Sequence, residues 1–132
     1  MSSKTKVFLS GGFSTGWQNI VIDKLKEKFI FFNPQKHGHS KVDLYTAWDI
    51  HFVKECDIFF AYMENTNPSG YGLAFELGIA HAMNKTIILV DERSLYDESF
   101  SRYFKMLHSS SNVTFSNLEG AMQYLESFSI TY

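Results

Sequence analysis

The segment that decides the fold is Asp57–Asp91, which reads DIFFAYMENTNPSGYGLAFELGIAHAMNKTIILVD. Two short apolar runs, Ile58–Met63 and Thr86–Val90, lie on either side of a longer segment, Tyr71–Met83, whose apolar residues recur with helical spacing. Continuous apolar runs of this length are typical of strands that are buried on both faces of a parallel sheet. The segment therefore predicts a strand, a crossover helix and a second parallel strand.

Outside this unit, short β-branched or aromatic runs again alternate with segments of helical period. The remaining predicted strands are Val7–Ser10, Phe29–Phe32 and Val113–Phe115, and the remaining predicted helices are Trp17–Lys28, Leu44–Cys56, Ser99–Leu107 and Leu118–Phe128. Asn117 or Ser116 is the expected N-cap of the last helix. This alternation predicts an α/β protein in which residues 1–132 form a single three-layer α/β/α domain. Its five-stranded parallel sheet would have the flavodoxin-like or Rossmann-like order 2-1-3-4-5.

Composition excludes several classes of protein. The 132 residues carry 12 Lys+Arg and 14 Asp+Glu, a net charge of −2, with no basic run that would neutralise nucleic-acid phosphates. The single cysteine, Cys56, excludes an intramolecular disulfide framework and a cysteine-based zinc cluster. His37 and His39 have no clear third ligand, so we expect no metal and no other cofactor. The N-terminal MSSKTK resembles neither a signal peptide nor a membrane span, and we expect a cytoplasmic protein without membrane or nucleic-acid partners.

Two carboxylates stand at positions where apolar residues belong. Glu76 lies in the apolar stripe of its helix, three residues after Leu73 and four before Ala80, and Asp49 shares a helix face with Phe52. A carboxylate among apolar groups is costly unless it is paired, neutral or used, so each acid either braces a nearby amide or basic group, or serves chemistry. Because both helices flank the third strand, the pair favours a site at a carbon that develops positive charge.

Two turn-rich loops are expected to frame a ligand crevice. In a sheet of the predicted order, ligands bind beyond the carboxyl ends of strands 1 and 3, where Ser10–Gly16 and Glu64–Gly70 follow. Gly11 and Gly12 let a ligand approach the main chain, and Gly72 leaves the backbone accessible near the start of the next helix. The spacing of GGFSTG fits neither a Walker motif nor a dinucleotide-binding fingerprint.

Three stretches together resemble the nucleoside 2-deoxyribosyltransferase superfamily, which includes the deoxynucleoside-monophosphate N-glycosidases. They are VFLSGGF (7–13), WDIHFVKECDIFFAYM (48–63) and SGYGLAFELGIAHAMNKTIILV (69–90). The most specific part is the G-x-x-x-ELG-x-A pattern at Gly72–Ala80. The resemblance implies that Glu76 attacks C1′ of a sugar and that Asp49 helps to hold the sugar or assist the base. It also implies a homo-oligomer whose site lies near the subunit interface.

The resemblance also implies a substrate-binding set, which is Phe8, Gly11, Gly12, Phe13, Ser69, Gly70 and Gly72. Phe8 stands where many members have tyrosine, and the glycine-rich loop of the family closes over the ligand. Gly70 stands where the transferases carry an aspartate that handles the nucleobase. The monophosphate glycosidases have a serine at that point, and its nearest counterpart is Ser69, one residue away.

The implied activity is cleavage of the N-glycosidic bond of a 2′-deoxynucleoside or its 5′-monophosphate through a covalent deoxyribosyl–glutamate intermediate. The sugar then passes to another base, as in a transferase, or to water, as in a hydrolase. Two alternatives use the same crevice: a non-catalytic nucleotide-binding sensor and an NAD-type glycohydrolase. The predicted burial of Glu76 favours catalysis over sensing, because binding alone requires only an amide.

Overall fold

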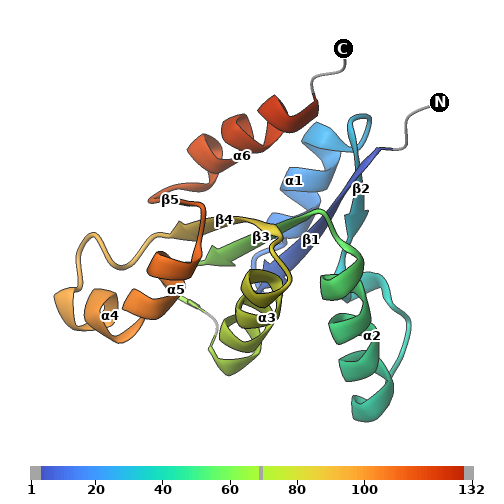
Figure 1. The fold of residues 1–132 in the computed structure, drawn as a ribbon, viewed down its shortest axis with the longest axis horizontal. Helices are drawn as coiled ribbons and strands as arrows, with labels where there is room; N and C mark the ends of the chain where they lie inside the picture. The colour runs from blue at the N-terminus through green and yellow to red at the C-terminus, as the bar shows by residue number, and fades with distance from the viewer. Residues whose placement is uncertain (1–3, 69, 130–132) are drawn as a thin grey trace.

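A five-stranded parallel sheet forms the centre of the protein, seen here in a computed structural model that describes residues 4–68 and 70–129 (Figure 1). Its strands are β1 (Thr5–Gly11), β2 (Phe29–Phe32), β3 (Ile58–Met63), β4 (Thr86–Asp91) and β5 (Val113–Phe115). They are paired in the order β2-β1-β3-β4-β5, and every pairing is parallel. The α/β class, the parallel sheet and the strand order predicted from the sequence are confirmed.

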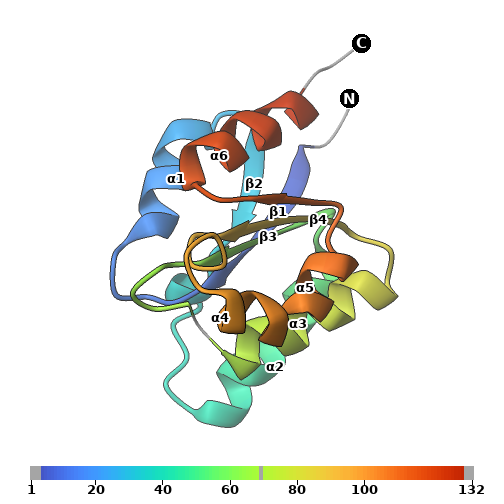
Figure 2. The same cartoon turned by 90° about the vertical axis from the view of Figure 1, so that its left-hand side faces the viewer.

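Helices cover both faces of this sheet. They are α1 (Trp17–Leu25), α2 (Val42–Glu55), α3 (Tyr71–Ala82), α4 (Glu98–Tyr103), α5 (Lys105–Ser110) and α6 (Leu118–Glu126), with the 3-10 turns η1 (Pro34–Lys36) and η2 (Ser127–Ser129). Figures 1 and 2 show α1 and α6 on one face and α2 to α5 on the other, which confirms the three-layer arrangement. Within residues 4–68 and 70–129, no helix combines the length and apolarity needed to cross a bilayer.

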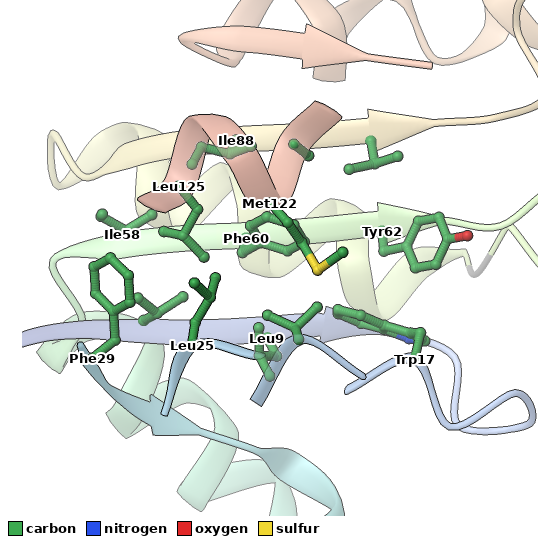
Figure 3. Close-up of a cluster of buried hydrophobic side chains, with 14 residues drawn as sticks. Leu9, Trp17, Leu25, Phe29, Ile58, Phe60, Tyr62, Ile88, Met122 and Leu125 are labelled. Carbon is green, nitrogen blue, oxygen red and sulfur yellow. The ribbon is translucent and has the colours of Figure 1, made fainter. Parts of the chain in front are cut away.

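Each face of the sheet has its own apolar core, because successive side chains of a strand point to opposite faces. On one face, Leu9 and Phe60 belong to a cluster with Trp17 and Leu25 of α1 and Leu125 of α6 (Figure 3). The other core lies between the sheet and helices α2 and α3, and its buried members include Phe8, Val53, Phe59, Met63, Leu73, Leu77 and Ile87. Since Ser10 has the parity of Phe8, its side chain faces α2 and α3.

The helix expected at Ser99–Leu107 is two helices, so the prediction of one continuous element was wrong. The Asp97 side chain accepts a hydrogen bond from the Phe100 backbone N–H, which starts α4 at Glu98. Phe104 then leaves the helical conformation (φ −100°, ψ 18°), and α5 begins at the next residue. At the other end of the chain, Asn117 caps α6 by accepting from the Gly120 N–H, as expected.

The carboxyl ends of β1 and β3 lie side by side, since Ser10 pairs with Ala61 and Gly11 with Tyr62. The strand order reverses between these two strands, with β2 beyond β1 and β4 beyond β3. Sheets of this type bind ligands at such a reversal, outside the carboxyl ends of the strands. The fold therefore places the start of α3 and the loop after β1 at the expected position of a ligand site.

Candidate active site

Glu76 lies on the sheet-facing side of α3, in contact with the end of β1. Leu73, Leu77 and Ala80 of the same helix are buried against the sheet, so the predicted apolar stripe is present. The Ser10 hydroxyl donates a hydrogen bond to Oε1 of Glu76 at 2.7 Å. This bond fixes a half-buried carboxylate at the carboxyl edge of the sheet.

Burial raises the pKa of Glu76 to about 7, and the nearby negative charge of Asp49 adds to the rise. The hydrogen bond from Ser10 acts in the opposite direction, because it stabilises the ionised carboxylate. Glu76 therefore changes its charge near neutral pH. A group with a perturbed pKa in a hollow is a candidate for chemistry.

Asp49 lies on α2 and is half-buried on the side of that helix that faces α3. Its Oδ1 atom is buried and has no hydrogen-bond partner among residues 4–68 and 70–129. Burial raises the pKa of Asp49, and the nearby His37 partly offsets that rise. An unpartnered buried oxygen is costly, so this atom is available to a ligand that supplies a donor.

A cavity of about 120 Å³ contains both carboxylates. It is lined by Ser10, Gly11, Phe13, Pro34, Asp49, Gly72, Leu73 and Glu76. Three larger hollows lie elsewhere on the described part of the molecule, and neither Glu76 nor Asp49 lines any of them. The ring of Phe13, which lines this cavity, is exposed at its mouth.

The loop after β1 has a fixed shape because its backbone approaches other groups closely. A Cβ atom on Gly11 would lie 2.7 Å from the Tyr62 carbonyl oxygen, so only glycine fits there. The Gly12 carbonyl accepts hydrogen bonds from Trp17 Nε1 and Gln18 Nε2, both at 2.9 Å. Two buried side chains of α1 thus hold the loop from beneath, and Gly11 borders the cavity.

Of the described residues predicted to bind substrate, Gly11, Phe13 and Gly72 line the cavity, whereas Phe8, Gly12 and Gly70 do not. Phe8 has no exposed surface and stacks on Phe59 within the core, at 5.8 Å between ring centroids, so it does not border the cavity, and its contact with substrate stays a prediction. Gly12 lies next to the lining residues and packs against Asn67. Gly70 precedes α3, with open space where a side chain would project. Ser69 lies outside the described residues.

For three residues that line the cavity, the sequence did not predict a position next to the two acids. Ser10 was expected only as the start of the loop Ser10–Gly16, and its partner Glu76 is 66 residues away. Pro34 and Leu73 were not expected at the site at all. Pro34 follows β2, whose carboxyl end lies at the same edge of the sheet, and this position was the available signal.

The histidines of the loop before α2 are engaged in stacking. His37 stacks on Tyr45 and on His39, with centroids 5.6 and 5.7 Å apart, and its Nδ1 accepts the His39 backbone N–H at 2.9 Å. Throughout the described part of the chain, no group of three or more His, Cys, Asp or Glu side chains is arranged to hold a metal ion.

Burial of Glu76 has a consequence for stability that a variant can test. Its folded-state pKa of about 7 exceeds the value of 4.5 for an ordinary glutamate, so between these pH values the folded protein binds more protons than the unfolded chain. Stability is therefore lost as pH rises through this window. We expect Glu76→Gln to stabilise the protein at pH 8 by on the order of 2 kcal/mol and to have little effect at pH 5.

Urea unfolding of the parent and the variant at both pH values measures this difference. Equal stabilities at pH 8 would show that the carboxylate is not destabilised by burial.

The fold and the site define a class of protein: a doubly wound α/β domain with two carboxylates in a cavity at the strand-order reversal. A family model described as "Nucleoside 2-deoxyribosyltransferase like" matches residues 4–94. The chain belongs to this nucleoside 2-deoxyribosyltransferase-like family.

Solved structures show the same fold. A 2-desoxiribosyltransferase from Leishmania mexicana is 19% identical, with a TM-score of 0.73 over 93% of this chain and 97% of that one. A CMP N-glycosidase from Clostridium botulinum, BcmB, is 25% identical, with a TM-score of 0.62 over 93% of this chain and 99% of that one. A conserved protein from Enterococcus faecalis V583 is 15% identical, with a TM-score of 0.72 over 96% and 99%. A comparison with curated proteins gave no match.

The family match thus places the chain among nucleoside 2-deoxyribosyltransferase-like proteins, and the solved structures agree with it in fold.

Proposed function

We propose that the protein cleaves the N-glycosidic bond of a 2′-deoxynucleoside or its 5′-monophosphate, with Glu76 as the nucleophile. The observation that carries this proposal is the bond from Ser10 to Glu76, which holds a half-buried carboxylate beside Asp49 in a cavity of sugar size. A carboxylate that served only to stabilise the fold would brace a nearby amide or a basic group. The groups that shift the pKa of Glu76 are instead a hydroxyl and a second acid.

In the first step, an oxygen of ionised Glu76 attacks C1′, and the C1′–N bond breaks. The bonding electron pair leaves with the base, which takes up a proton. The absence of a 2′-hydroxyl eases positive charge at C1′, and the negative charge of the two acids stabilises it. The product of this step is a deoxyribosyl ester of Glu76. Asp49, which lines the same cavity, is placed to hold the sugar or assist the leaving base.

In the second step, water or a second base attacks C1′, and the Glu76 carboxylate leaves. Water yields the free sugar, and a base yields a new nucleoside. Gly70 puts no side chain at the start of α3, so base exchange loses the contact that an acid there would supply. The proposal includes a homo-oligomeric, cytoplasmic enzyme that needs no cofactor, in which the base extends past Phe13 toward a neighbouring subunit.

One assay tests the proposal and its alternatives. The purified protein is incubated with deoxynucleosides, with their 5′-monophosphates and with NAD, with and without an acceptor base, and released base is followed by chromatography. Base release from a deoxynucleoside or its monophosphate supports the proposal, and a new nucleoside identifies transfer. Release from NAD alone supports the glycohydrolase, and tight binding without any release supports the sensor. Either of these last results contradicts the proposal.

The pH dependence of the reaction follows from the pKa of Glu76. Because attack requires the ionised form, kcat/KM is expected to fall about tenfold per pH unit below pH 7 and to level off above it. Ser10→Ala removes the hydrogen bond that lowers this pKa, so the falling limb moves to higher pH. Rates measured from pH 5 to pH 9 test the shift.

Ser127, the first residue of η2, provides a control for this experiment. Its hydroxyl donates a hydrogen bond to the Tyr124 carbonyl of α6, far from the cavity residues along the chain. Ser127→Ala is expected to keep the parent profile. Identical profiles for Ser10→Ala and the parent would contradict a role of Ser10 in setting the charge of Glu76.

A further inference from the structure

A groove of about 410 Å³ lies at the free edge of the sheet, apart from the cavity that holds Glu76. It is bordered by β2, which is the edge strand next to β1, and by residues of α1, η1 and α2 (Figure 1). Phe31 and Phe32 of β2 and Trp48 of α2 supply aromatic walls. Trp48 is held in place by Phe52, which lies 4.5 Å away between ring centroids. The groove is larger than the candidate active site, and its lining combines these aromatic rings with polar side chains.

Two lysines give this groove a positive charge. Lys26, just after α1, and Lys36, at the end of η1, both line it, and no acidic residue is among the described residues that do. Two lysines close to Lys26 in the sequence do have partners: Lys24 pairs with Glu119 and Lys28 with Glu126. The structure shows no such ion pair for Lys26 or Lys36 within the residues it describes. An anionic group at this position would meet two ammonium groups.

Besides the aromatic walls and the two lysines, the groove contains a buried hydrogen-bond donor, on the side chain of Asn33. Its side chain is 5% exposed and lines the groove, and its Oδ1 accepts the Gln35 backbone N–H at 3.1 Å. Its Nδ2 is buried, and within residues 4–68 and 70–129 nothing accepts a hydrogen bond from it. A buried donor without an acceptor is costly and is satisfied when a ligand brings an oxygen or a ring nitrogen.

We propose that this groove is a second ligand site, which takes a small planar aromatic anion of up to nucleotide size. The aromatic ring of the ligand packs against Phe32 and Trp48, which lie on the same face of the sheet, and its anionic group lies between Lys26 and Lys36. An acceptor atom of the ligand takes the free hydrogen of Asn33 Nδ2. Pockets of a few hundred Å³ with aromatic walls and a few polar groups are typical small-molecule sites.

The groove and the candidate active site share a wall. Asn33 and Trp48 line the groove, and the residues that follow each of them, Pro34 and Asp49, line the cavity with Glu76. A ligand bound in one of the two hollows therefore lies close to the other hollow. A binding test must distinguish a ligand in the groove from a ligand in the cavity with Glu76. The proposal itself does not depend on the reaction at Glu76.

Fluorescence of Trp48 reports on the groove, because Trp17 is 1% exposed in the core and Trp48 is half-buried at the site. The probes are adenosine 5′-monophosphate, benzoate and adenosine, each titrated into the full chain at low salt. We expect saturable quenching by the two anions and at least fivefold weaker binding of uncharged adenosine. Tighter binding of adenosine 5′-monophosphate than of benzoate identifies a phosphate ligand, and the reverse identifies a carboxylate. Added salt weakens the binding of both anions.

Variants locate the ligand. The double variant Lys26→Gln, Lys36→Gln is expected to weaken anion binding about tenfold, since two exposed ion pairs of ordinary strength are lost. Lys24→Gln carries the same kind of change on α1 outside the groove and is expected to bind as the parent does. Gly72→Phe fills the candidate active site, where a Cβ meets open space, and leaves the groove unchanged.

Three results overturn the proposal. They are the absence of saturable quenching by either anion, equal affinity for adenosine and its monophosphate, and loss of binding in Gly72→Phe with retention in the double lysine variant. The last result places the ligand at Glu76 instead. Calorimetry with Trp48→Phe checks the assignment independently, because this variant loses the fluorescence change but keeps an aromatic wall and the binding heat.

Discussion

Replacing Glu76 with glutamine is expected to reduce base release at least a thousandfold while the protein stays folded. Glutamine keeps the shape of the side chain and the oxygen that accepts the Ser10 hydroxyl, at 2.7 Å from Glu76 Oε1 in the parent. It cannot form the ester with C1′, so the loss is that of the nucleophile. Chromatographic detection of released base, with the best deoxynucleoside or monophosphate as substrate, measures the effect.

Asp49→Asn is the matched comparison for this experiment, since Asp49 shares the cavity but is not expected to form a bond to the sugar. A smaller loss than in Glu76→Gln is expected, because the covalent step remains available. If Glu76→Gln kept more than a tenth of the parent rate, Glu76 would not be the nucleophile.

Replacing Trp17 with alanine is expected to give the largest loss of stability, about 3–5 kcal/mol. Trp17 is 1% exposed, and its ring meets Tyr62 edge-on at 5.1 Å and lies 6.1 Å from Phe60 (Figure 3). Removal of the ring leaves a cavity between α1 and the sheet. Its Nε1 also holds the Gly12 carbonyl, so the glycine-rich loop beside the active site is released as well. Urea unfolding measures the free-energy loss.

Trp17→Phe separates the two contributions of Trp17. Phenylalanine retains much of the packing but cannot donate to Gly12, so we expect a smaller stability loss together with slower base release. Base release at the parent rate in a folded Trp17→Phe protein would show that the loop does not depend on this hydrogen bond.

The sheet was predictable because its central strands are apolar on both faces. The bounds of β2, β3 and β5 agree with the sequence prediction, and so does the strand order. Helix ends were less predictable, because they depend on tertiary contacts and local caps. The predicted Trp17–Lys28 ends as α1 at Leu25, where the apolar residues stop and the exposed Lys26 and Glu27 follow.

The two acids of the candidate site were predictable as exceptions to a pattern. Glu76 and Asp49 interrupt apolar stripes, and the structure brings both into one cavity. The absence of Phe8 from the cavity lining has a physical reason: Phe8 and Ser10 point to the same face, but Phe8 lies one side-chain pair further from the carboxyl edge and is covered by the core. Depth along a strand depends on which helices cover it, and the pattern of β1 alone does not contain that information.

Mass spectrometry of the acid-quenched reaction tests the central idea most directly. The protein is mixed with a deoxynucleoside or monophosphate that it cleaves, stopped within the first turnover, and digested. The peptide that contains Glu76 is predicted to gain the mass of one deoxyribosyl group, and the Glu76→Gln protein is predicted to gain none. Release of base without a sugar adduct on any peptide, or an adduct on a residue other than Glu76, would contradict the account.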